Sequence, residues 1–296
     1  MVTNNPRPPP DYQQLETGIG SGTAQQFQPV AAARRGASSY RKVHRGEGPA
    51  LKPYSTKGLD TLQVDPVRGH AQFLEYRNSM AANVPPAGVP GGGGSGGSAL
   101  RYARSGAQDK RQNEASYTAM RSDVKQQYKH MTGPEAEGGM GLTHSVHKED
   151  PYPDAAAMAA DVRDNKHIKT MSSKTTGGHN FFTNDENDQF RAVHDVFGHA
   201  GTGRGFSRHG EEAAYLSHSQ MFSKKALPAL ASETRGQNSY LNYNNEGKGF
   251  PDQSKKTPLV TMSPQATQKG PVTGPLPWKP QVIKPEPPTH TQGKLF

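Results

Sequence analysis

The stretch that decides the fold is FRAVHDVFGHAGTGRGFSRHGEEAAYLSHSQMF, residues 190–222, which holds four of the chain's twelve histidines and three acidic residues. We expect helices at about 188–199 and 210–231. This density of imidazole and carboxylate groups stands out in a chain that is otherwise poor in core-forming residues. The stretch therefore predicts that something binds between its histidines and acids.

The composition of the whole chain indicates one modest folded unit. Leu, Ile, Val and Phe make up about 14% of the 296 residues, below the roughly 20% that is usual in chains that fold independently. Gly (33) and Pro (25) are abundant, and segments rich in them bury too little apolar surface to offset the entropy of ordering. We expect a mainly α fold with minor strands: one small helical domain with long, irregular Pro/Gly-rich arms at both ends.

Three regions follow from this pattern. Residues 1–99 are predicted to be an extended low-complexity arm that ends in the glycine-rich linker PPAGVPGGGGSGGSA, residues 85–99. Residues 100–250 are predicted to be the helical domain that contains the His and Glu residues, and residues 251–296 an extended tail rich in Pro and Lys. Within the domain, further helices are expected at 113–131 and 153–165, and strands within 140–152 and at 166–171.

The charge balance and the lack of cysteine limit the functions to be considered. A net charge of +9 favours contact with polyanions, so a nucleic-acid-binding module is one hypothesis and a merely solvated basic surface is its alternative. Without cysteine, disulfides and thiolate chemistry are excluded, and a metal ion must bind His, carboxylate or water. No apolar stretch approaches 18 residues and no signal peptide is recognised, so we expect no contact with a membrane.

His194 and His199 belong to the motif HDVFGH and are five residues apart. On an ideal α-helix this spacing turns the second residue by about 140° from the first, so the two rings do not share a face. They converge on one ion only if the helix ends or distorts between them. We expect the distortion at Gly198, where glycine makes it easiest. A hydrogen-bonded interior role for His194 is the alternative.

Acidic and polar residues of the next helix are candidates for the rest of a site. Glu211 lies in the first turn of that helix and could be a third ligand, or could simply complement the helix dipole. At the far end, the run ETRGQNS contains Glu233, Arg235, Gln237 and Asn238. We expect this run to form a site wall, in which Arg235 orients an anionic substrate. Gln237 or Asn238 would fix the polar groups of that substrate. A helix cap in which Arg235 pairs with Glu233 is the alternative.

Two imidazoles and one carboxylate on three corners of an octahedron form the facial arrangement that holds non-haem Fe(II). Three positions then stay open for substrate and oxygen. Mn, Ni or Zn also accept such ligands. The residues therefore predict a divalent-metal site at His194 and His199, with Fe(II) as the favoured ion.

The HDVFGH element resembles the HDxxGH or HExxGH element of the pterin-dependent aromatic amino-acid hydroxylases. In that family both histidines hold iron, and a glutamate further along the chain completes the site. The resemblance implies that His194 and His199 are ligands and that Glu233 is the carboxylate; Glu211 stays the other candidate on its position in the next helix. Ala200 stands where that family has proline.

A longer stretch resembles a domain of proteins encoded by tailed bacteriophages. The likeness covers about residues 115–245, through YTAMRSDVKQQYKHM, DPYPDAAAMAADV, FRAVHDVFGHA, GEEAAYLSHSQMFS and ETRGQNSYLNY. In those proteins the domain often lies inside long virion-borne or ejected polypeptides. The resemblance implies a location in the virion, or otherwise in the host cytoplasm. It also implies capsid, portal or tail proteins as partners, with packaged DNA as an additional candidate.

Three functional hypotheses follow from these features. The first is a virion-associated structural protein, either a minor capsid or a tail-associated component, that carries a metal-binding domain. The alternative is a metal-dependent enzyme, of the non-haem Fe(II) oxygenase type or a hydrolase, that acts after delivery into the host. A nucleic-acid-binding module is the second alternative, and it rests on charge alone.

Overall fold

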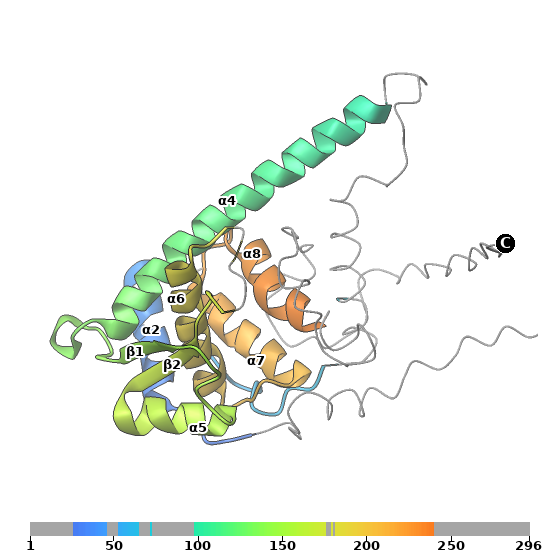
Figure 1. Cartoon of the computed structure of the whole chain (residues 1–296). Helices are drawn as coiled ribbons and strands as arrows, with labels where there is room; N and C mark the ends of the chain where they lie inside the picture. The colour runs from blue at the N-terminus through green and yellow to red at the C-terminus, as the bar shows by residue number, and fades with distance from the viewer. Residues whose placement is uncertain are drawn as a thin grey trace, which may run out of the picture.

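A computed structural model describes residues 26–45, 53–64, 72, 98–175, 179 and 181–239. These residues form a mainly helical fold with two short strands, as the sequence predicts (Figure 1). The predicted tail at 251–296 lies outside the described residues. So do most of the predicted arm at 1–99 and nearly all of its glycine-rich linker.

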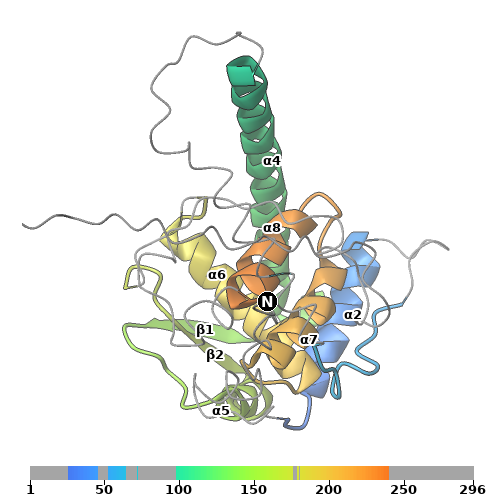
Figure 2. The ribbon, with the colours of Figure 1, turned by 90° about the vertical axis from the view of Figure 1, so that its right-hand side faces the viewer.

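The longest helix, α4 (Ser98–Thr132), packs its C-terminal half along the body of the fold, and its N-terminal half extends away from it (Figures 1 and 2). The helix predicted at 113–131 is confirmed, because apolar side chains at three- and four-residue steps are buried on one face. These side chains are Tyr117, Met120, Val124 and Met131. The same helix contacts α6 (Asn184–His194) and α8 (Leu227–Ala231).

The two strands, β1 (Thr143–His147) and β2 (His167–Met171), pair in parallel. The connection between them runs through α5 (Ala155–Ala160) and the π-helical turn η2 (Asp161–Asn165), as parallel strands require a crossover. Asp154 begins α5 by accepting a hydrogen bond from the backbone of Ala157. The strands predicted within 140–152 and at 166–171 and the helix predicted at 153–165 are thus confirmed.

Part of the predicted N-terminal arm is instead a helix of the core, α2 (Ala31–Arg45). Its buried face consists of Ala33, Gly36, Ala37 and Tyr40. Apart from Tyr40 these residues are small and carry little hydrophobicity, although they recur at helical spacing. Gly36 lies so close to Met140 that a Cβ atom would not fit between them. The compact unit therefore begins well before the boundary predicted near residue 100.

Residues near the N-terminus hold the chain just after the HDVFGH motif. The Val30 N–H donates to the carbonyl oxygen of Ala200 at 2.8 Å. Residues 53–64 make a second contact with this part of the chain, because the buried guanidinium of Arg204 donates to the carbonyl oxygen of Leu62 at 2.9 Å. Segments far away in the sequence thus help to fix the direction of the motif's histidines.

Candidate metal centre

A change in helix type brings His194 and His199 onto one face. After His194 the chain continues into a π-helical turn, η3 (Asp195–Ala200), in which the Gly201 N–H reaches the carbonyl oxygen of Val196, five residues back. In such a turn hydrogen bonds join residues five apart and each turn holds more residues than in an α-helix, so the angular offset between the two histidines is reduced. The two rings lie edge to face with centroids 5.1 Å apart. The predicted distortion is confirmed, and its form is a π turn.

Gly198 has a different role from the one expected, because its backbone stays helical. A Cβ atom at this position would lie 3.0 Å from the Cβ of Ala214 and 3.3 Å from its carbonyl oxygen. The missing side chain therefore lets α7 (Arg208–His218) lie close against η3. This approach brings Glu211, in the first turn of α7, beside the two imidazoles.

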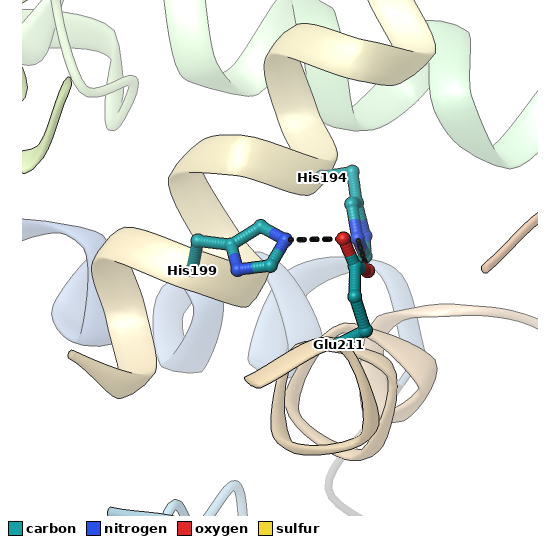
Figure 3. Close-up of side chains that lie close together, drawn as sticks. All are labelled: His194, His199 and Glu211. Atoms are coloured by element: carbon teal, nitrogen blue, oxygen red, sulfur yellow. Dashed lines mark hydrogen bonds and ion pairs between the residues drawn. The ribbon is translucent and has the colours of Figure 1, made fainter. Parts of the chain in front are cut away.

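Glu211 completes a cluster with His194 and His199, rising from α7 to face both rings (Figure 3). The Nε2 atom of His194 lies 3.4 Å from Oε2 of Glu211, and Nε2 of His199 lies 3.5 Å from Oε1. One ligand atom from each residue lies within 4.8 Å of the other two. This cluster of two imidazoles and one carboxylate could hold a metal ion.

The outer ring nitrogens show which atoms face the cluster. Nδ1 of His199 lies 3.0 Å from the carbonyl oxygen of Arg204, so Nδ1 carries the hydrogen and Nε2 of the neutral ring has a lone pair. Nδ1 of His194 lies 3.2 Å from Nδ1 of His218, which leaves Nε2 of His194 toward the cluster. The Nε2 atoms of His194 and His199 and the carboxylate oxygens of Glu211 are then all hydrogen-bond acceptors, and they converge at one largely buried site. They need a cation among them, either a proton or a metal ion.

Charges within the cluster shift the pKa values of its members. Burial opposes ionisation of Glu211, but the positive charge of His199 and hydrogen bonds from both histidines outweigh it and lower the pKa of this carboxyl. Burial also disfavours the charged form of His199, yet the Glu211 carboxylate raises the pKa of the ring. Burial raises the pKa of the adjacent Asp195 to about 6. The cluster as a whole favours a bound positive charge.

The cluster borders a cavity of about 410 Å³, a volume in the range of small-molecule sites. Its wall is formed by β2, α6, the first turn of α7 and η5 (Ser232–Gly236). His194 and Glu211 contribute to this wall. The wall also contains the acids Asp150, Asp195 and Glu233, the basic residues Lys169, Arg191 and His179, and the polar residues Tyr152, Thr170, Asn187, Thr234, Gln237 and Asn238.

Glu233, the carboxylate implied by the hydroxylase resemblance, lies in the same cavity wall but outside the cluster. Its Oε1 accepts from Nε2 of His179 at 3.1 Å and from the Tyr117 hydroxyl. Its Oε2 accepts from the amide of Gln237 at 2.6 Å. Both oxygens are thus held by other donors, whereas the oxygens of Glu211 face the two imidazoles.

The structure places two of the three predicted substrate contacts in the cavity wall and the third outside it. Gln237 and Asn238 line the cavity. Arg235 does not belong to the lining; it is buried, with Nε donating to Glu212 at 3.0 Å and the guanidinium 4.0 Å from the centre of the Tyr215 ring. Arg235 therefore links η5 to α7 through Glu212, and neither the predicted role of orienting an anionic substrate nor the alternative pairing with Glu233 is what the structure shows.

Other residues around the cluster had little or no local signal in the sequence. His218 lies behind His194, and burial lowers its pKa well below the usual value. Its seven-residue spacing from Glu211 on α7 is the one feature that points to it. Gln127 on α4 is one of several polar residues in the run KQQYKH, and His179 lies in the loop before α6; neither stands out in the sequence, and the fold alone brings them to the site.

No described helix is both long enough and apolar enough to cross a membrane. Comparison with known proteins identifies no relative: no protein family, curated protein or solved structure matches this chain.

Proposed function

We propose that this chain carries a mononuclear divalent-metal centre, held by His194, His199 and Glu211, at which a small molecule reacts. The supporting observation is the convergence of two ring nitrogens and a carboxylate at the wall of a cavity (Figure 3). These three ligands leave three positions of an octahedral ion open, and Fe(II) is the ion that we favour. When bound, Fe(II) supplies redox chemistry with oxygen, whereas Zn or Mn would polarise a bond or activate water.

The remaining cavity groups are suited to binding a small polar molecule. Gln237 and Asn238 supply amide groups, which can both donate and accept hydrogen bonds. Arg191 supplies a positive charge in the wall, with its Nη1 donating to the carbonyl oxygen of Met171 at 3.0 Å. Phe190 and other apolar side chains add surface for a less polar part of the substrate. We infer a small polar substrate.

Metal content tests this proposal. Wild-type protein, loaded with Fe(II) without oxygen, is expected to hold about one ion per chain by elemental analysis. The double variant His194→Ala with His199→Ala is expected to lose it, because one carboxylate alone binds such ions weakly. His147→Ala removes an exposed histidine of β1 and is expected to keep the ion. Equal metal content in the wild type and the double variant would contradict the proposal.

We also propose that the chain is a component of a phage particle, either a minor capsid or a tail-associated protein. What supports this is the likeness of residues 115–245 to a phage domain and the Gly- and Pro-rich sequence on both sides of it. The metal-dependent reaction would then follow delivery into the host. Mass spectrometry of purified, nuclease-treated particles is expected to find the chain at a fixed ratio to capsid, portal or tail proteins. Its absence from intact particles would contradict this role.

A further inference from the structure

A buried chain of hydrogen bonds connects α4 to the ligand His194. Nε2 of His218 lies 2.6 Å from Oε1 of Gln127, and Nδ1 of the same ring lies 3.2 Å from Nδ1 of His194. Both Gln127 and His218 are fully buried. Neither belongs to the ligand set, so their hydrogen bonds affect a metal ion only through His194.

The amide at the end of this chain sets the direction of its hydrogen bonds. Nε2 of Gln127 donates to the carbonyl oxygen of Met221, at 3.4 Å. With the amide rotated by half a turn, its oxygen would face that carbonyl, acceptor against acceptor. Oε1 is therefore the atom that faces His218. Because Oε1 can only accept, Nε2 of His218 carries the hydrogen.

The second nitrogen of His218 then accepts a hydrogen bond. The ring is fully buried, and its hydrogen-bond partners are an amide oxygen and another imidazole, so it is neutral. Its Nδ1 therefore has a lone pair, and Nδ1 of His194 donates to it. Nε2 of His194 keeps its own lone pair toward Glu211. His199 has the same tautomer because its Nδ1 donates to a backbone carbonyl oxygen.

We propose that Gln127 and His218 are positioning residues that hold His194 in the tautomer that binds the metal ion. This inference rests on the proposed metal centre. Outer partners of metal-binding histidines fix the ring tautomer, and their loss commonly weakens metal binding 10–100-fold. Here the outer partner is an imidazole, which can reverse its own tautomer. The Gln127 amide is what prevents the reversal.

Substitutions of Gln127 test the inference through metal affinity. In Gln127→Leu, His218 loses its acceptor and can move its hydrogen to Nδ1, so that His194 carries its own hydrogen on Nε2, where the ion must bind. We expect Zn²⁺ to bind about 10–100-fold more weakly in competition with a chromophoric chelator.

Ser116→Ala is a matched control on the same helix, because it removes a buried hydroxyl that accepts from the Ala229 N–H at 3.0 Å. It is expected to lower stability without changing the affinity for Zn²⁺. If Gln127→Leu bound Zn²⁺ as tightly as Ser116→Ala, the inference would be overturned and the metal centre would stand.

The tautomer itself can be measured by NMR of protein labelled with ¹⁵N-histidine. In the metal-free wild type, His218 is expected to carry its hydrogen on Nε2, and Gln127→Leu is expected to shift it toward Nδ1. A merely structural role for Gln127 would leave this signal unchanged. An Nδ1 hydrogen on His218 in the wild type would overturn the inference, even if the variant failed to fold. If the wild type bound no ion, the proposed function would fail, and this measurement would still decide the hydrogen-bond direction.

Discussion

Two adjacent acids on α7, Glu211 and Glu212, have opposite surroundings. Glu212 is fully buried, and its Oε2 accepts from Arg235 at 3.0 Å and from Arg208 at 3.1 Å. Glu211 lies about 100° further round the helix, is partly exposed, and faces the two imidazoles of the cluster. One carboxylate is held by guanidinium groups, the other by rings that can exchange a proton for a metal ion.

This difference shows what separates a structural carboxylate from a site carboxylate. The pKa of both acids is lowered, because in each case the neighbouring groups outweigh the opposing effect of burial. The direction of the shift therefore does not distinguish them. The kind of partner does: a guanidinium keeps its charge at any ordinary pH, so the pairing of Glu212 is permanent. The partners of Glu211 can instead become metal ligands.

Removing the charge of Glu212 is the strongest test of this comparison. Glu212→Gln leaves Arg208 and Arg235 buried without a carboxylate, so the free energy of unfolding is expected to fall by about 3–5 kcal/mol. Glu211→Gln leaves no permanent charge buried, and a loss of about 1 kcal/mol is expected. Urea denaturation of the metal-free proteins, followed by circular dichroism, measures both. Equal losses would show that the two acids have the same structural role.

A second test changes the position of Glu211 without replacing its side chain. In Gly198→Ala the new methyl group would lie 3.0 Å from the Cβ of Ala214, so α7 must shift away from η3. Such overpacking is expected to cost about 1–3 kcal/mol of stability, and the affinity for Zn²⁺ is expected to fall because the carboxylate moves relative to both rings.

Gly201 provides the control for this substitution. It follows the same turn, but the nearest atom to its Cβ would be 3.6 Å away, an ordinary contact. Gly201→Ala is therefore expected to keep stability and Zn²⁺ affinity near those of the wild type. Equal affinities in the two variants, measured by competition with a chelator, would mean that the close approach at Gly198 does not position Glu211.

Most elements of the domain could be predicted because their signals are local, but the single helix expected at 210–231 is broken, since α7 ends at His218 and Phe222 is extended before α8 begins. Apolar residues at helical spacing mark 113–131, and Asp154 lies where a helix cap is expected. α2 is not expected from the sequence, because its buried residues, although they recur at three- and four-residue steps, are mostly Ala and Gly within an arm rich in Gly and Pro. Its helix is stabilised by close packing, as at Gly36 against Met140, and such fit depends on a distant part of the chain.

The site was predictable in part for the same reason. The motif HDVFGH indicates two imidazoles near one ion, and the need for a distorted helix follows from their spacing. The choice between Glu211 and Glu233 as the third ligand does not follow from the sequence, because both acids border the same cavity. It depends on which carboxylate is already held by donors, and the donors to Glu233 come partly from α4 and from the loop before α6.

Glu233 combines features of the two acids of α7. Its oxygens are held by donors, as those of Glu212 are, but one of these donors, His179, can lose its charge. Burial disfavours the charged form of His179, but Glu233 outweighs it and raises the pKa of the ring. Burial likewise opposes ionisation of Glu233, and His179 with two further hydrogen-bond donors lowers the pKa of that carboxyl. In the unfolded chain these groups titrate near 6.5 and 4.5. The charged pair therefore stabilises the fold fully between those pH values.

His179→Asn isolates this contribution, because asparagine keeps an acceptor for the N–H groups of Phe181 and Phe182, which donate to Nδ1 at 3.0 and 3.1 Å. It removes the Nε2 donor to Glu233. Wild type is expected to exceed the variant in unfolding free energy by on the order of 1 kcal/mol between pH 4.5 and 6.5. The difference should shrink as the pH rises through the raised pKa of His179. Urea denaturation at several pH values measures it. A difference that did not change with pH would mean that His179 donates as a neutral ring, and that Glu233 keeps its charge through its other donors.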